Sequence, residues 1–462
     1  MFKNLFRLSL SRKTGTKDIH PESVRIVMIK NSIMLKQGDQ IKIATGGEAT
    51  ILEELGTGGQ GTVYKVVFNH KEYALKWYHQ PGKAEFYDNL KNNIAKGSPS
   101  SCFLWPLFLT AKDENGCYGY LMELRDACYK EFSDFLLAKV QFKTVSAMIE
   151  AGIKICSSFR KLHNAGYSYQ DLNDGNFFIN PENGDLLICD NDNIAPYGTN
   201  TGILGKCRYM APEIVRKEKQ PDAQSDRFSL AVILFLLFFN NHPLEGALVA
   251  NCPCMTEKHE KKFYGTSPLF IYDPDNNQNH PVPGIHVNVI GLWNQFPDYV
   301  RKMFEEQFSQ KVLMNPNLRI TEKEWLTKVL LRMRHELIVC PACGGEIFTD
   351  MENNTFSCPD CHQVLQRPPI IQSGEYEVAV CKGKTIYQYI TNQNKPLLNK
   401  ETGMIVESKK TPGLFALSNQ TAETWILTTK SGNTRPIAPN EFAPLLVGNQ
   451  IAFGNGTNVT IR

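Results

Sequence analysis

The segment from Tyr169 to Asn176 carries the residue types best suited to chemistry in this chain, in the order Tyr-Gln-Asp-Leu-Asn-Asp-Gly-Asn. Asp171 and Asn176 stand in one short predicted loop. An aspartate placed there can accept a hydroxyl proton, and an asparagine oxygen can hold a divalent cation against nucleotide phosphates. Aspartate and asparagine are also ordinary turn residues. The pattern therefore predicts phosphoryl transfer only if the flanking segments position the loop.

Those flanking segments have the expected character. Apolar residues at helical spacing run from Ile149 to His163 before the loop, and an apolar strand over 186–188 leads to Asp190 after it. With these neighbours the region resembles the catalytic loop and metal-binding segment of eukaryotic-like protein kinases. The resemblance implies that Asp171 is the catalytic base and that Asn176 and Asp190 hold Mg²⁺ or Mn²⁺.

A glycine-rich segment precedes this region in the chain. Between two apolar strands the sequence reads Gly56-Thr-Gly58-Gly-Gln-Gly61-Thr-Val63, where the glycines would let the backbone lie close to phosphates. A simple hairpin turn is the alternative. The strand that follows carries Lys76, at the spacing of the phosphate-binding lysine of kinases. The residues expected to bind ATP are Gly56, Gly58, Gly61, Val63, Ala74, Lys76, Glu85, Met122, Glu123 and Leu124.

Two members of that set have roles of their own. Lys76 needs an acidic partner on the next helix, and Glu85 is the only glutamate between Pro81 and Trp105, with Asp88 as the alternative. A glutamate favoured by the helix dipole in the first turn is the competing interpretation. By resemblance Met122 is the gatekeeper residue, followed by a hinge that offers backbone groups to adenine.

The catalytic region also departs from the family pattern. Tyr169 and Gln170 occupy the usual His-Arg positions, and Asn173 replaces the usual catalytic-loop lysine. Asp-Asn-Asp at 190–192 replaces Asp-Phe-Gly. Without the arginine, control by an activation-loop phosphate is doubtful. Asn173 can still donate a hydrogen bond to the transferred phosphoryl group, but it brings no charge.

Further motifs extend the resemblance over about residues 50–335. Glu213, in Tyr-Met-Ala-Pro-Glu, matches the end of a kinase activation segment, and Asp226 matches the buried aspartate that binds the catalytic loop. Arg319 fits the arginine that pairs with Glu213. We therefore expect an α+β, two-lobed catalytic domain over 46–336. Cys252 and Cys254, in a long insertion, are interpreted as two free thiols of a loop.

A narrower resemblance rests on the catalytic loop, the Asp-Asn-Asp-Asn run at 190–193 and the segment 264–274. Together these segments look like a bacterial branch whose members accompany a von Willebrand A protein and a metal-dependent phosphatase in tellurite-resistance-associated phosphorylation triads. The resemblance implies a protein substrate and these two proteins as partners.

Two modules are expected after the catalytic domain. Over 337–366 two Cys-x-x-Cys pairs, Cys340 with Cys343 and Cys358 with Cys361, suit a closed, structural tetrahedral Zn²⁺ site, with free thiols or a redox pair as alternatives. Residues 373–462 are rich in Thr, Val and Ile with frequent turn signals, which predicts an all-β sandwich. Its end resembles forkhead-associated domains, but no histidine follows His362, so we expect docking, with phosphopeptide recognition as the minority interpretation.

Composition constrains the remaining alternatives. The chain has 462 residues, 42% of them hydrophobic, and a net charge of +3, which gives no electrostatic reason to expect a nucleic-acid partner. The longest apolar run, 230–239, is too short to span a bilayer. Thirteen cysteines in a long chain favour a reducing, cytoplasmic location. Alternating residues over 24–55 predict short strands. Residues 1–45 are expected to be an extension that packs or moves, with a short membrane-surface helix over 1–17 as the alternative.

The function favoured by these patterns is an ATP- and Mg²⁺-dependent serine/threonine protein kinase. A nucleotide-binding pseudokinase scaffold is the main alternative, because Gln170, Asn173 and the Asp-Asn-Asp segment are altered. Small-molecule phosphotransfer is a third, opposed by the pairing expected between Glu213 and Arg319.

Overall fold

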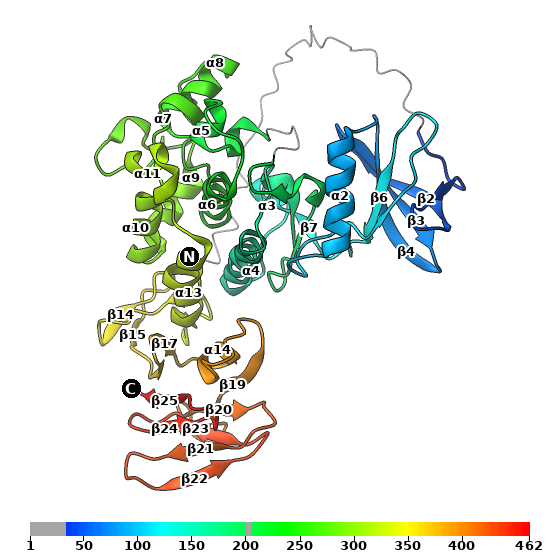
Figure 1. Cartoon of the computed structure of the whole chain (residues 1–462). Helices are drawn as coiled ribbons and strands as arrows, with labels where there is room; N and C mark the ends of the chain where they lie inside the picture. The colour runs from blue at the N-terminus through cyan, green and yellow to red at the C-terminus, as the bar shows by residue number, and fades with distance from the viewer. Residues whose placement is uncertain (1–33, 200–204) are drawn as a thin grey trace.

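The computed structural model describes residues 34–199 and 205–462 (Figure 1). Most of the expected N-terminal extension, including the strand expected near Ile26 and Met28, lies outside these residues. Figure 1 shows a sheet with one helix, a helical lobe, and a C-terminal β region that lies against the helical lobe near α13 (Leu331–Glu336). Within the described ranges, none of the helices combines the length and apolarity that crossing a membrane requires.

The first lobe is a six-stranded sheet with strand order β1-β2-β3-β4-β6-β5. Its elements are β1 (Gln40–Lys42), β2 (Glu48–Thr57), β3 (Gly61–Phe68), β4 (Lys71–Tyr78), α2 (Ala84–Lys96), β5 (Phe108–Leu109) and β6 (Gly119–Glu123). Alternate residues of β3 are buried, as expected for a strand with one face on a core. Because β1 pairs with β2, the sheet begins at Gln40, before the boundary at residue 46 expected from the sequence.

The second lobe is helical and is built around α4 (Val145–Asn164) and α6 (Ala223–Phe239). Nearly every side chain of α6 beyond Arg227 is buried, which fits its continuous apolar sequence. The other helices are α3 (Phe132–Leu136), α5 (Pro212–Val215), α7 (Ala247–Ala250), α8 (Glu257–Glu260), α9 (Val287–Leu292), α10 (Asp298–Gln307), α11 (Gln310–Met314), α12 (Glu322–Glu324) and α13. A π-helical turn at Trp325–Leu330 joins the last two.

Short strands and 3-10 turns from β7, directly before α3, to η3, before α5, carry the expected catalytic segments. They are β7 (Lys130–Glu131), β8 (Tyr167–Ser168), η1 (Asp174–Asn176), β9 (Phe177–Ile179), β10 (Leu186–Ile188), η2 (Asn191–Asn193), β11 (Ala195–Pro196) and η3 (Cys207–Tyr209). β9 pairs with both β10 and β7, while β11 pairs with β8. These pairings bring the loop after β8 beside the segment after β10.

Two small hairpins follow α13. They are formed by β12 (Leu337–Val339) with β13 (Glu346–Phe348), and β14 (Thr355–Ser357) with β15 (Val364–Gln366). β13 also contacts the helical lobe. The Glu346 carboxylate accepts hydrogen bonds from the backbone N–H groups of Val145 at 2.5 Å and Ser146 at 3.4 Å, which belong to the first turn of α4. A helix N-terminus leaves such groups without intrahelical partners, so Glu346 satisfies two of them.

The C-terminal region consists of two antiparallel sheets of six and four strands. The first has the order β17-β16-β25-β24-β21-β22 and the second β18-β19-β20-β23, with the short helix α14 (Gln388–Thr391) between β18 and β19. The strands are β16 (Ile370–Ser373), β17 (Tyr376–Ala379), β18 (Thr385–Tyr387), β19 (Glu401–Glu407), β20 (Phe415–Asn419), β21 (Trp425–Thr428), β22 (Thr434–Ile437), β23 (Phe442–Pro444), β24 (Gln450–Ala452) and β25 (Asn458–Ile461).

A buried cation fixes this region to the helical lobe. Arg334 of α13 donates from Nε to Glu150 of α4 at 2.6 Å and from Nη1 to the carbonyl of Leu398 at 3.0 Å. Its guanidinium also stacks on the ring of Tyr387, 4.2 Å from the centroid. The β region therefore contacts α13, which is itself bound to α4.

Candidate active site

A cleft of about 760 Å³ lies between the sheet and the helical lobe. Its size falls in the range of small-molecule sites. The expected residues that line it are Gly56, Gly58, Gly61, Val63, Ala74, Lys76, Met122, Glu123, Leu124, Asp171 and Asp190. The turn between β2 and β3, which holds Gly58, forms one wall, and β4 and β6 form another. The structure thus brings together three sequence segments that lie far apart in the chain.

Several lining residues were not expected from the sequence. Leu104, Phe178 and Cys189 contribute to the cleft, together with Arg125, whose guanidinium lies 4.0 Å from the Phe178 ring centroid. Phe178 is in β9, directly after the catalytic loop, so alternation along that strand was an available signal. Nothing in the sequence around Leu104 indicates that it lines the cleft, because only the tertiary structure brings it there.

Lys76 has two acidic partners, and neither is on α2. Its Nζ lies 2.8 Å from Oδ2 of Asp192 and 3.1 Å from Oδ1 of Asp190. The Asp192 side chain is 0% exposed, whereas that of Asp190 is 49% exposed. Burial lowers the pKa of Lys76, but the two carboxylates outweigh it and raise the pKa above its ordinary value. The lysine is therefore held in its charged form.

The expected pairing of Lys76 with Glu85 is wrong. Glu85 is exposed in the first turn of α2, where a carboxylate is favoured by the helix dipole, and none of the ion pairs of the described residues joins it to Lys76. The alternative, Asp88, is exposed as well. The helix α2 instead contacts the chain just after η2 through Asn89 and Asn93, which both donate to the carbonyl of Ile194 at 2.8 Å.

The segment 190–192 is anchored by polar contacts where the family pattern has a phenylalanine. Asn191 is buried and donates from Nδ2 to the carbonyls of Leu104 at 2.8 Å and Ile188 at 2.9 Å. The hydroxyl of Tyr78 donates to Asp192 at 2.5 Å. Asp190 itself has φ of 53°, in the left-handed region that non-glycine residues rarely adopt. Such backbone conformations concentrate at functional sites.

Hydrogen bonds of two asparagines within the catalytic loop fix its conformation. Asn173 caps η1 by accepting from the N–H of Gly175, and Asn176 Oδ1 accepts from the N–H of Asn173 at 2.8 Å. Asn173 Nδ2 lies 3.3 Å from Asp171 Oδ1. Burial raises the pKa of Asp171; the hydrogen bond from Asn173 opposes this and the charge of Asp190 adds to it. A raised pKa suits a carboxylate that accepts a proton.

Lys206 is a catalytic-loop neighbour that was not expected from the sequence. It precedes η3 in the segment between η2 and α5, and its Nζ donates to Asn173 Oδ1 at 3.0 Å. The same ammonium lies 3.5 Å from an Asp174 carboxylate oxygen. A lysine so far from the loop in sequence has no pattern that marks it.

Asp226, in the first turn of α6, binds the backbone of the catalytic loop. Its carboxylate accepts from the backbone N–H groups of Tyr169 at 2.6 Å and Gln170 at 3.2 Å. His163 bridges Asp226 at 3.0 Å and Glu322 at 2.8 Å. Burial lowers the pKa of His163, but the two carboxylates outweigh it and raise the pKa to about 9. The histidine is therefore charged at neutral pH.

The Glu213–Arg319 brace lies in the same lobe. Arg319 donates from Nη1 at 2.8 Å and from Nη2 at 2.6 Å to the two carboxylate oxygens of Glu213, and both side chains are buried. Bidentate geometry of this kind fixes orientation as well as charge. Gln170 makes a neutral contact with the activation segment by donating to the carbonyl of Thr199 at 2.7 Å.

The oxygen donors around the cleft suit a hard divalent cation. Asp190 offers a half-exposed carboxylate to the cleft, and the amide oxygen of Asn176 lies in the adjoining loop. Carboxylate and amide oxygens are the ligands that Mg²⁺ accepts in proteins. The residue types therefore fit the group that the sequence implied.

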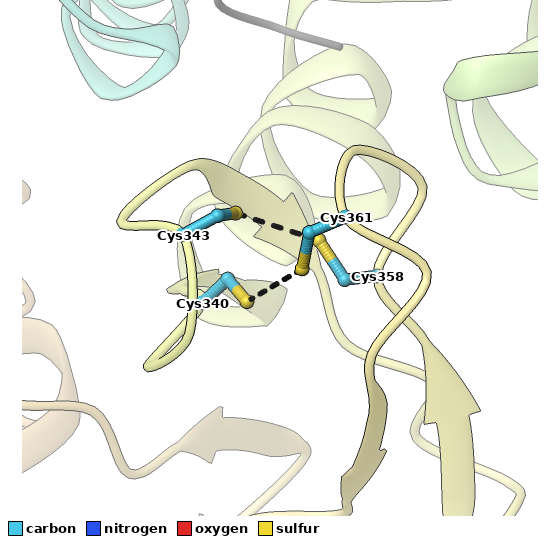
Figure 2. Close-up of side chains that lie close together, drawn as sticks. All are labelled: Cys340, Cys343, Cys358 and Cys361. Atoms are coloured by element: carbon cyan, nitrogen blue, oxygen red, sulfur yellow. Dashed lines mark hydrogen bonds between the residues drawn. The ribbon is translucent and has the colours of Figure 1, made fainter.

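The four expected cysteines form one cluster away from the cleft. Cys340 and Cys343 come from the loop between β12 and β13, and Cys358 and Cys361 from the loop between β14 and β15 (Figure 2). The four Sγ atoms lie within 4.8 Å of one another, with the Cys340–Cys361 and Cys343–Cys358 pairs at 3.9 and 3.8 Å. Zn–S bonds of about 2.3 Å in a tetrahedron place sulfurs about 3.8 Å apart, so the cluster fits Zn²⁺.

Comparison with known proteins agrees with this geometry. The profile of a family described as "Protein kinase domain" matches residues 49–327. The chain is 24% identical to Protein kinase YegI of Escherichia coli O157:H7 over 336 residues, which are 69% of this chain and 49% of that protein. It is 23% identical to Protein kinase YegI of E. coli K12, over 71% of this chain and 50% of that protein. The chain thus spans about half the length of these relatives.

A more distant match is to a putative serine/threonine-protein kinase/receptor, R831, of Acanthamoeba polyphaga mimivirus. The identity is 23%, over 43% of this chain and 13% of that protein.

Proposed function

The chain belongs to the protein kinase domain family, and from that premise we propose that it transfers the γ-phosphate of ATP to serine or threonine hydroxyls of proteins. The observation that carries the proposal is the arrangement of Lys76, Asp171 and Asp190 around one cleft, with Asn176 in the adjoining loop. These are the groups that phosphoryl transfer requires for positioning, proton acceptance and metal binding.

Each residue has a defined task in this proposal. Lys76, held by Asp192, orients the α- and β-phosphates, and Asp171 orients the acceptor hydroxyl. As the acceptor oxygen bonds to the γ-phosphorus, the bond from that phosphorus to the β-phosphate oxygen breaks, ADP leaves, and the hydroxyl proton passes to Asp171. Mg²⁺ or Mn²⁺ bound by Asn176 and Asp190 would supply charge neutralisation at the phosphates.

The regions beyond the catalytic domain have supporting roles in the proposal. The Cys340, Cys343, Cys358 and Cys361 cluster holds a structural Zn²⁺, since four thiolates leave no open coordination position. The two C-terminal sheets dock partner proteins. A cognate phosphatase and a von Willebrand A protein are candidate partners on the resemblance of the loop segments alone.

The test is phosphate transfer from γ-labelled ATP with Mg²⁺ or Mn²⁺ to the chain itself and to generic protein acceptors. Wild type is expected to incorporate label at serine or threonine, and Asp171→Asn to lower kcat by about 10²–10⁴-fold. Nucleotide affinity should be nearly unchanged in that variant, because Asp171 does not hold Lys76. Phosphopeptide mapping identifies the acceptor residues.

Two results would overturn the proposal. Equal incorporation by wild type and Asp171→Asn would place the chemistry elsewhere. Nucleotide-dependent thermal stabilisation without any transfer by wild type would instead favour the scaffold function, which the altered 190–192 segment allows.

A further inference from the structure

The catalytic loop has a neutral residue where phosphoryl transfer benefits from a cation. Asn173 stands between the base and the metal-binding asparagine, and it carries no charge. Charge spreads over the equatorial oxygens of the phosphoryl group in transfer, so a preorganised positive group there stabilises the transition state. The fold places the ammonium of Lys206 directly on Asn173.

Asn173 links this ammonium to the base. Its Oδ1 accepts from Lys206 Nζ at 3.0 Å, and its Nδ2 donates to Asp171, 3.2 Å from the carbonyl oxygen and 3.3 Å from Oδ1. The amide is therefore oriented from both ends: its oxygen faces the cation and its nitrogen faces the base.

The backbone next to Lys206 also lies close to the proposed base, Asp171. Gly205 has φ of +75°, and a Cβ atom at that position would lie 3.0 Å from Asp171 Oδ1. A side chain there would be both strained in its backbone and crowded against the carboxylate. The activation segment thus contacts the base through residue 205 and the loop through residue 206. The two neighbouring contacts hold one short piece of chain against the site.

We propose that Lys206 is a catalytic residue, whose ammonium contacts the transferring γ-phosphoryl oxygens in place of a catalytic-loop lysine. The inference rests on the proposed kinase function. In the step already given, with the acceptor proton going to Asp171 and ADP leaving, Lys206 exchanges no proton and forms no covalent bond. It stabilises negative charge on the equatorial oxygens. The Lys206 side chain is 61% exposed, so it is free to turn from Asn173 and Asp174 to a phosphate.

The test uses the full chain and steady-state kinetics with ATP. Lys206→Ala should lower kcat by about 10²-fold, the effect of removing one preorganised donor, with the KM for ATP changed by less than about threefold. Lys206→Arg should retain much of the rate. Lys219→Ala, which removes an exposed lysine just beyond α5, is the matched control and should keep wild-type kcat.

The decisive variant restores a positive charge near the phosphoryl group by placing a lysine in the catalytic loop itself. Asn173→Lys in the Lys206→Ala background should recover at least about tenfold in kcat, because a cation again faces the same phosphate oxygens. Thermal unfolding of Lys206→Ala and Lys206→Arg should match wild type, since the Lys206 side chain is mostly exposed. A kcat of Lys206→Ala equal to that of wild type overturns the inference.

Two further outcomes are separable. If Lys206→Ala loses rate but Asn173→Lys restores none, and Lys206→Arg is as slow as Lys206→Ala, the lysine acts only on segment structure and the inference is overturned. If wild type itself transfers no phosphate, the proposed kinase function fails first, and this inference fails with it.

Discussion

The Glu213–Arg319 brace and the Lys76–Asp192 pair are both buried charge pairs, but their hydrogen bonds are distributed differently. In the brace, both carboxylate oxygens of Glu213 are occupied by one guanidinium. In the cleft, Lys76 divides its hydrogen bonds between the enclosed Asp192 and the half-exposed Asp190. A pair whose carboxylate has both oxygens occupied fixes architecture, whereas a pair that includes a half-exposed carboxylate keeps capacity for a ligand.

The difference also separates contacts between residues of recognised motifs from contacts that only the fold reveals. The brace joins residues in motifs with a recognised spacing, one at the start of α5 and the other before α12. The contacts of Asp192 with Lys76 and of Lys206 with Asn173 come from the described residues 190–199 and 205–206. The proposed roles of Asp192 and Lys206 would give this part of the chain two functions that the family pattern assigns to α2 and to the catalytic loop.

The largest expected effect comes from removing the ion pair between Glu213 and Arg319. Arg319→Leu leaves Glu213 buried without its cation and should lower the free energy of unfolding by about 3–5 kcal/mol. Urea denaturation measures the change. Arg301→Leu is the control: it removes a surface pair with Asp298 and should cost less than about 1 kcal/mol. Equal losses in the two variants would contradict the structural role of the brace.

A second prediction concerns the proton on His163. The folded-state pKa of about 9 lies above the ordinary value, so the stabilisation is complete below about pH 6.5 and is lost as pH rises through about 9. From about pH 6 to about pH 10 this contribution should fall by about 3 kcal/mol. Urea denaturation of wild type beside His163→Gln isolates it, since only wild type carries this proton. A constant difference between the two proteins across that range would refute it.

The smallest expected effect separates the two candidate partners of Lys76. Asp192→Asn weakens a hydrogen-bonded charge pair worth about 1.5–3 kcal/mol, so nucleotide affinity should fall by roughly 10–100-fold. Glu85→Gln should change it by less than about twofold, because Glu85 is exposed and does not contact Lys76. Titration with a fluorescent nucleotide gives both dissociation constants. A larger loss for Glu85→Gln would restore the interpretation based on α2.

Much of the fold could be predicted because the signals are local or strongly periodic. The apolar sequence of α6 and the glycine-rich turn between β2 and β3 mark their elements directly. Lys76, Asp171 and Asp190 could be placed at one site because their motifs occur in a recognised order. Glu85 could not be judged correctly, since the sequence shows that a helix follows β4 but not which side chains of that helix lie near Lys76.

The contacts of Asp192 and Lys206 lay beyond prediction for a related reason. Each depends on where a loop returns after leaving the site, and loops have no period from which a direction can be read. Asp192 stands next to residues that were predicted to be functional, yet only the fold shows that its carboxylate turns back to β4.

The contact between the Glu346 carboxylate of β13 and the first turn of α4 bears on which fragments of the protein can be stable on their own. Its oxygens satisfy N–H groups of Val145 and Ser146, and the same helix leads directly into the catalytic loop. A fragment that ends at residue 336 keeps every residue matched by the family profile but exposes the N-terminus of its central helix. We therefore expect a fragment that also includes the cysteine-bearing hairpins to be more stable than one that ends at residue 336.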